Sequence, residues 1–265
     1  MRRLSSFNIT GLLLGYSFLY IPILTVVVLS FNESMLVTTW TGFTTKWYRS
    51  LLENEGLIDA VLASLKIASM TASMAVIVGT LAAVVMVRFG AFQGRTLFSG
   101  LVSAPLIMPD IMTGLAMLMM FVTTEQLIGW PSHRGIMTIT IAHITLATAY
   151  VYLIVQARLS DFDRSLEEAA QDLGARPAKV FMVITLPIIA PSLISGWLLA
   201  FALSLDDLVI ASFLSGPGAT TLPMLIFSSI RLGVSPEINA LASIIVFIIA
   251  IGVMIAGLLS WRKNR

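Results

Sequence analysis

Six long apolar stretches constrain the fold of this chain more than any other feature of its sequence. An α-helix rises about 1.5 Å per residue, so about 20 apolar residues cross the ~30 Å hydrocarbon layer of a bilayer. Each stretch is long enough to do so, and the sequence therefore predicts an all-α membrane protein with six transmembrane helices. The predicted spans are Gly11–Ser30, Ala60–Val87, Leu97–Val122, Ile136–Gln156, Ala190–Leu214 and Asn239–Ser260.

The composition excludes several other classes of protein. Hydrophobic residues make up 57% of the chain and charged residues only 11%, whereas about a quarter of a soluble domain is charged. The basic residues form no patch between the apolar runs, so the net charge of +2 does not indicate a nucleic-acid partner. The absence of cysteine excludes disulfides, thiol catalysis and iron–sulfur clusters. The lipid bilayer is the partner that this composition requires.

The distribution of Lys and Arg predicts the orientation, because cytoplasmic connections are enriched in these residues. One set of termini and connections holds eleven of them and the other holds four, which places both termini in the cytoplasm. Lys66 lies just inside the second span. No repeat or linker divides the chain, so we expect one transmembrane domain over residues 1–265, with the first span kept as an anchor. The eleven are Arg2, Arg3, Arg88, Arg95, Arg158, Arg164, Arg176, Lys179, Arg262, Lys263 and Arg265; the four are Lys46, Arg49, Arg134 and Arg231.

The most specific motif lies in the predicted cytoplasmic loop, residues 157–189. It reads Glu-Ala-Ala, three residues, Gly, nine residues, Ile, one residue and Leu-Pro. Its diagnostic positions are Glu168, Ala169, Ala170, Gly174, Ile184, Leu186 and Pro187.

The same loop predicts a short helix outside the membrane. Ser165 is expected to cap it, with Glu168 completing a capping box, and Gly174 and Pro177 are expected to end it. One face would be small and apolar, and a groove in another protein is the expected place for such a face. That face consists of Leu166, Ala169, Ala170 and Leu173, spaced i, i+3, i+4 and i+7.

This motif resembles the coupling-helix signature of permease subunits in binding-protein-dependent, ATP-driven importers. The resemblance implies a type I importer permease fold, with the motif residues contacting an ATPase. It also implies a bacterial inner-membrane complex with a second homologous permease, two ATPase subunits and a periplasmic binding protein. The chain has no Gly-rich run ending in Gly-Lys-Ser/Thr. We therefore expect no cofactor here, with ATP and Mg on the partner ATPase, and no enzyme activity in this subunit.

Three acids lie within the predicted spans, namely Asp110 in the third and Asp206 and Asp207 in the fifth. A carboxylate at the bilayer centre costs about 2.5–3.5 kcal/mol, so such residues face the bundle interior or a hydrated path. At 1.5 Å per residue, Asp110 lies about 20 Å along a continuous third span. No Lys or Arg lies deep in any span, so the acids suit a cationic cargo. Trp197 and Phe201 share a stripe near the pair, and aromatic faces hold ammonium groups.

Structural roles remain open for these groups. One acid of the pair would hydrogen-bond to backbone or to a neighbouring helix, because adjacent side chains point about 100° apart. Either acid could instead pair with an Arg of the partner permease. His143 is expected to be a hydrogen-bonded interior residue rather than a metal ligand, and no metal site is predicted. The connection at residues 215–223 breaks helix repeatedly, and Met224–Ile230 is expected to form an interfacial or re-entrant half-helix.

The resemblance extends over nearly the whole chain to the polyamine branch of these importers, most closely to the putrescine permeases. It is carried by residues 104–110, 167–174 and 203–218, among others. It implies putrescine import by alternating access, with spermidine or another small cation as the alternative cargo. Two other classes stay open at this point. An ion-coupled secondary carrier would also use intramembrane acids, and a passive channel would need filter-like segments that the sequence does not show.

Overall fold

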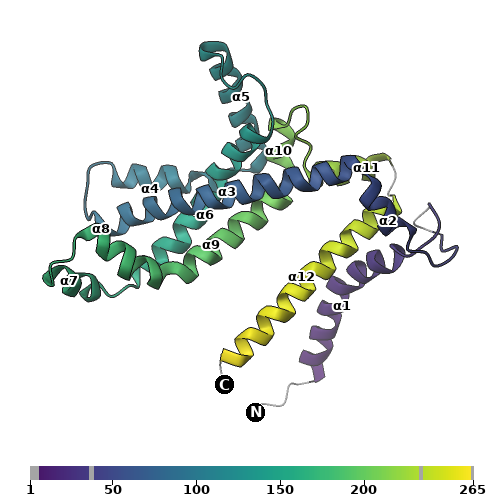
Figure 1. Cartoon of the computed structure of the whole chain (residues 1–265), viewed down its shortest axis with the longest axis horizontal. Coiled ribbons are helices and arrows are strands. Elements are labelled where there is room, and N and C mark those ends of the chain that lie inside the picture. Colours follow the sequence, from purple (N-terminus) through teal and green to yellow (C-terminus); the bar gives the residue numbers. More distant parts are fainter. Residues whose placement is uncertain (1–5, 36–38, 233–234, 264–265) are drawn as a thin grey trace. The chain divides into compact units, whose positions relative to one another are not determined.

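The computed structural model describes residues 6–35, 39–232 and 235–263, and these are almost entirely helical (Figure 1). Within those ranges the β-structure is one isolated bridge, between Asn32 and Phe43. The all-α prediction is confirmed. Three basic residues of the charge count, Arg2, Arg3 and Arg265, lie outside the described residues.

The chain divides into two compact units. Unit 1 comprises Met1–Ile58 and Ile226–Arg265, and unit 2 comprises Asp59–Leu225. The helices α3 (Glu55–Arg88) and α11 (Leu222–Leu232) continue from one unit into the other. That the whole chain acts as a single permease domain stays a prediction.

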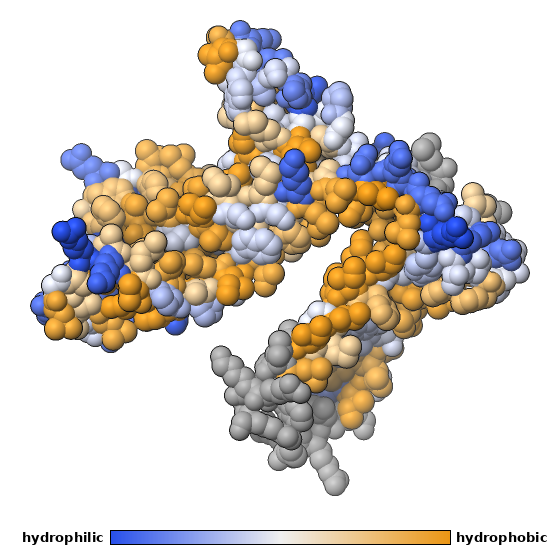
Figure 2. Space-filling view, viewed as in Figure 1, coloured by the Kyte–Doolittle hydropathy of each residue, from blue (hydrophilic) through white to orange (hydrophobic). Residues whose placement is uncertain are grey.

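Unit 1 contains α1 (Ser6–Leu29), α2 (Lys46–Glu53) and α12 (Pro236–Lys263), and α12 packs against both of the others. Glu237 in the first turn of α12 accepts hydrogen bonds from Ser50 and Asn54, which fixes the start of α12 to the end of α2. The side chains of α1 are exposed over residues 8–25. Figure 2 shows broad hydrophobic surface along the helices of both units, as expected of helices that face lipid.

The core of unit 2 is built where α6 (Ile136–Ser160) packs against α3 and α9 (Leu186–Asp206). Gly79 of α3 and Gly196 of α9 both face Val151 of α6. A Cβ on Gly79 would lie 2.9 Å from the Val151 Cβ, and one on Gly196 would lie 3.5 Å from its Cγ1. These contacts are typical of membrane helices, where small residues let backbones approach closely.

Five spans are found among the described residues, and the predicted count of six stays a prediction. Five helices are long and apolar enough to cross a membrane: Asn8–Leu29, Glu55–Arg88, Asp110–Ile128, Ile136–Ser160 and Pro177–Asp206. The sixth predicted span, Asn239–Ser260, falls inside α12. The orientation of the termini stays a prediction.

The third predicted span is not one helix, and the prediction of a continuous Leu97–Val122 helix is wrong. The segment forms α4 (Arg95–Ser103), a 3₁₀ turn η1 (Ala104–Leu106) and then α5 (Asp110–Ile128). Proline lacks an N–H and disfavours helical backbone in the residue before it, so Pro105 and Pro109 together end the helix rather than kink it. Asp110 is therefore the first residue of α5, and helical rise from the start of the segment does not give its depth.

The fifth predicted span, Ala190–Leu214, is also interrupted, so its prediction as one helix is wrong. The helix α9 ends at Asp206, Asp207 has extended backbone with φ −67° and ψ 124°, and α10 runs over Val209–Leu214. The next helix, α11, covers the predicted half-helix of residues 224–230.

The predicted cytoplasmic loop is more helical than expected. It contains α7 (Ser165–Asp172), α8 (Pro177–Val180) and a π-helical turn η2 (Phe181–Thr185) that leads directly into α9. The last three motif positions, Ile184, Leu186 and Pro187, therefore lie in this helical run and not in a loop.

Candidate functional site

The helix α7 begins and ends through local hydrogen bonds, and its first cap differs from the prediction. Ser165 is already the first helical residue, so it does not cap the helix; its N–H donates to Asp163 Oδ1 at 3.0 Å. Hydrogen bonds from the Ser165 backbone and side chain hold the pKa of Asp163 below its ordinary value. The sequence reasoning missed Asp163 because Ser165 and Glu168 have the spacing of a capping box.

The motif glycine, Gly174, ends α7 as predicted. Gly174 has φ +86°, a left-handed conformation that glycine adopts without a steric penalty. The Gly174 N–H donates to the Gln171 carbonyl at 2.8 Å, and the Ala175 N–H donates to the Ala170 carbonyl at 3.0 Å. These two bonds form a Schellman motif. Pro177, which was expected to help end α7, begins α8 instead.

The apolar face of α7 is uncovered, as predicted. Leu166 is 48% exposed and Leu173 is 90% exposed, and no residue of α7 is buried. Glu168 and Ala169 are exposed and Ala170 is half-buried.

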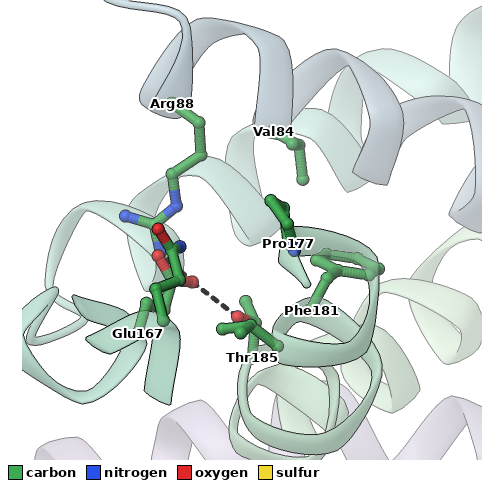
Figure 3. Close-up of a pocket in the computed structure, with 8 residues that line it drawn as sticks. Val84, Arg88, Glu167, Pro177, Phe181 and Thr185 are labelled. Atoms are coloured by element: carbon green, nitrogen blue, oxygen red, sulfur yellow. Dashed lines mark hydrogen bonds and ion pairs between the residues drawn. The ribbon is translucent and has the colours of Figure 1, made fainter. Parts of the chain in front are cut away.

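The adjacent glutamate, Glu167, points the other way, into the protein (Figure 3). Its Oε1 lies 2.8 Å from Arg88 Nη2 at the end of α3 and accepts a hydrogen bond from the Thr185 hydroxyl of η2. The sequence analysis did not single out Glu167, because the motif assigns significance only to the second of the two glutamates. The three residues border a cavity of about 380 Å³, which is also lined by Val84, Gln171, Pro177, Val180 and Phe181.

Basic side chains gather around the end of α3. Arg95 donates hydrogen bonds to the carbonyls of Met86 and Gly90, and Arg164 donates to the carbonyl of Val87. Cations at a helix C-terminus offset the unpaired carbonyls and the negative end of the helix dipole. Arginines counted as cytoplasmic in the sequence analysis thus come together at one end of unit 2.

Within the predicted spans, Asp207 is fully engaged by protein groups. Its Oδ2 lies 3.1 Å from His143 Nε2 and accepts the Ala211 N–H at 2.8 Å. His143 Nδ1 lies 2.7 Å from Ser204 Oγ. Because a carboxylate only accepts, Nε2 of a neutral ring carries the proton and Nδ1 accepts from Ser204. The side chains of His143 and Asp207 are 3% and 10% exposed. His143 is therefore a hydrogen-bonded interior residue, as predicted. Among the described residues, no cluster of side chains could hold a metal ion.

The other two acids are placed differently. Asp110 and Asp206 are exposed, and neither has an ion pair or a side-chain hydrogen bond within the described part of the chain. The helices α5 and α10 pack together, and a Cβ on Gly114 would lie 3.4 Å from the Cα of Ile210. Asp110 is the first residue of α5, and Asp206 is the last residue of α9, just before the break that precedes α10.

The side chains of Trp197 and Phe201 are partly buried in contacts with the protein. Trp197 and Phe201 stack with ring centroids 5.2 Å apart and planes 14° apart. Trp197 Nε1 donates to Ser73 Oγ of α3 at 3.2 Å. Both rings are half-buried against the core of unit 2. That they line a cargo path stays a prediction.

Comparison with known sequences gives a consistent result. A model of the family described as "Binding-protein-dependent transport system inner membrane component" matches residues 75–261. The chain is 57% identical over 261 residues to the putrescine transport system permease protein PotI of Escherichia coli strain K12, covering 98% of this chain and 93% of that protein. It is 38% identical over 250 residues to the spermidine/putrescine transport system permease protein PotC of the same strain, covering 94% and 92%.

Solved structures share the fold at low sequence identity. A chain from a bacterial ABC transporter that imports the acidic polysaccharide alginate matches with a TM-score of 0.73 and 16% identity, over 98% of this chain and 99% of that chain. A chain from the MetNI methionine ABC transporter in an inward-facing conformation matches with a TM-score of 0.59 and 18% identity, over 79% and 96%. At these identities the likeness concerns the fold alone.

Proposed function

Because this chain belongs to the family of binding-protein-dependent transport system inner membrane components, we propose that it is a permease subunit of an ATP-driven putrescine importer. The cargo follows from the 57% identity to a putrescine permease over 98% of the chain. The geometry supports the proposal through one observation above all. The helix that carries the motif lies outside the spans and presents an exposed apolar face.

In this proposal the chain is a transport subunit, and the hydrolysis of ATP takes place elsewhere. Two ATPase subunits bind ATP and Mg, and the exposed residues of α7 dock into them. A second homologous permease completes the transmembrane pathway, and a periplasmic binding protein delivers the cargo. Closure of the ATPases moves α7, and the bundle alternates between outward-facing and inward-facing states.

The cargo is proposed to meet Asp110 and Asp206. Both carboxylates are exposed and unpaired among the described residues, and they stand at helix ends: Asp110 begins α5, and Asp206 ends α9 just before α10, which packs against α5. Two unpaired carboxylates suit a cargo with two ammonium groups. Asp207 is already satisfied by His143 and backbone N–H groups, so we assign it to holding the break between α9 and α10. Trp197 and Phe201 would contact the cargo through their exposed parts.

One alternative has specific support from the comparisons, and a second would make use of the same acids. The 38% identity to a spermidine/putrescine permease favours a broader polyamine preference. An ion-coupled carrier would also use Asp110 and Asp206, but it would not require the exposed apolar face of α7.

The deciding experiment reconstitutes the whole complex in vesicles and measures putrescine uptake. ATP is expected to be required, and collapse of the membrane potential with an ionophore is expected to leave uptake in place. Uptake that follows the potential and ignores ATP would show a secondary carrier. Spermidine competition then measures the breadth of the cargo preference.

Variants separate the docking role from the cargo role. Leu173→Asp places a charge on the face that docks, so the ATPase should no longer co-purify with the permease. Leu127→Asp, at another strongly exposed leucine, near the end of α5, should retain it. Asp206→Asn removes one carboxylate from the cargo, and a lost charge-assisted hydrogen bond of about 1.5–3 kcal/mol raises KM about tenfold or more. An unchanged KM would remove Asp206 from the path.

A further inference from the structure

We propose that Glu167 is a positioning residue for import, because its carboxylate ties the coupling helix to the ends of two transmembrane helices. The inference rests on the proposed function and assigns a mechanical part to a residue outside the docking motif. Movement of α7 by the ATPase would then reach α3 through Arg88 and α9 through Thr185 at the same time.

The two glutamates at the start of α7 face in different directions. Successive residues of a helix point about 100° apart, and here Glu168 is exposed while the Glu167 side chain is only 16% exposed. Glu168 is thus free to meet the ATPase, and Glu167 faces the membrane-spanning part of the same unit. One oxygen of Glu167 receives both the Arg88 guanidinium and the Thr185 hydroxyl.

Packing alone does not fix α7. None of its residues is buried, and a cavity of about 380 Å³ separates part of α7 from α3 and η2. Arg164, just before α7, adds one hydrogen bond to a carbonyl of α3. The Glu167 contacts therefore supply most of the directional connection between α7 and the spans within the described residues.

The burial of these contacts suits them to pass movement of α7 on to α3 and α9. Arg88 is only 17% exposed, so the ion pair is poorly screened by water and keeps its strength. Thr185 is 1% exposed and ends a π-helical turn, a kind of turn that is frequent at functional sites. Glu167 therefore contacts the π-helical turn η2, which joins α9 to the preceding part of the loop at residues 157–189.

The test measures putrescine imported per ATP hydrolysed in the reconstituted complex. Glu167→Gln keeps the shape of the side chain and removes its charge, and the ratio is expected to fall about fivefold or more, the usual scale of coupling between sites. ATPase binding should be unchanged, which separates this variant from the docking variants. Asp161→Asn, an exposed acid at the end of α6, is the matched control and should behave as the wild type.

Rescue distinguishes a positioning role from general damage. The double variant Glu167→Arg with Arg88→Glu restores the ion pair in reverse and is expected to recover a large part of the ratio that each single variant loses. A double variant no better than the single ones would overturn the proposal. If Glu167→Gln fails to assemble, Thr185→Val decides, because it removes only the buried hydroxyl; normal coupling in that variant would also overturn it.

A second readout does not depend on transport. The chain has no cysteine, so two exposed positions can be changed to cysteine and accept a pair of spin labels in the assembled complex. They are Gln171, which lies in α7 on the side of Glu167 and not on the apolar face, and Phe89 at the end of α3. The distance distribution between α7 and the end of α3 should be narrow in otherwise unaltered protein and broad with Glu167→Gln. Failure of the wild type to import putrescine would contradict the proposed function, whereas equal distributions would contradict the role of Glu167.

Discussion

Replacement of Asp207 by Ala tests how the break in the fifth span is held. The carboxylate accepts the N–H of Ala211 at 2.8 Å and that of Ile210 at 3.4 Å, and it also bonds to His143 Nε2 at 3.1 Å. The alanine variant therefore removes the cap of α10 and leaves a buried ring nitrogen without its partner.

The cost follows from these two losses. Removal of a helix N-cap costs about 1 kcal/mol, and a buried donor left without an acceptor costs about 1–3 kcal/mol. Their sum is about 2–4 kcal/mol, and each kcal/mol shifts the Tm of a unit this size by about 2–4 °C, so the Tm should fall by about 4–16 °C. Asp207→Asn keeps an acceptor for the backbone N–H groups and should lose less.

The assay is thermal unfolding of the purified complex in detergent, followed by tryptophan fluorescence. Asp206→Asn is the matched control, because its exposed carboxylate has no partner among the described residues, and it should unfold at the wild-type temperature. A wild-type Tm for Asp207→Ala would refute the reasoning. So would additive losses when His143→Ala is combined with it, because groups in contact should couple.

Two further predictions concern the connection at residues 215–219 and the first turn of α7. Gly216→Ala should lower the Tm strongly and release residues 215–219 to proteolysis, because a Cβ there would lie 2.1 Å from the Arg134 carbonyl oxygen; intact resistance to protease would contradict this. Asp163→Ala should speed amide exchange in the first turn of α7 at neutral pH. The pKa of Asp163 is lowered in the folded protein, so the stabilisation from its hydrogen bond with the Ser165 N–H is fully present above the ordinary Asp pKa. The difference between variant and wild type should therefore disappear as the pH falls through the lowered pKa.

The sequence predicted the helical spans and the coupling helix because both are encoded locally. Hydrophobic length identifies a span without knowledge of its neighbours, and Gly174 ends α7 as its position in the motif indicates. The breaks before Asp110 and after Asp206 were not predicted, since apolar residues continue on both sides of each break. Pro109 could have signalled the first break, and Asp207, as a residue type that caps helices, could have signalled the second.

The sequence by itself determined that the chain is a helical membrane protein, and it located the helix outside the spans that carries the motif. Only the tertiary structure decided that Glu167 turns inward while Glu168 stays exposed, and that Asp207 is held by His143 while Asp206 is not. The reason is geometric. Glu167 and Glu168 are adjacent residues of one helix and point about 100° apart, whereas the backbone leaves the helix at Asp207. Which of two neighbouring acids meets protein and which meets solvent therefore depends on packing against helices distant in sequence.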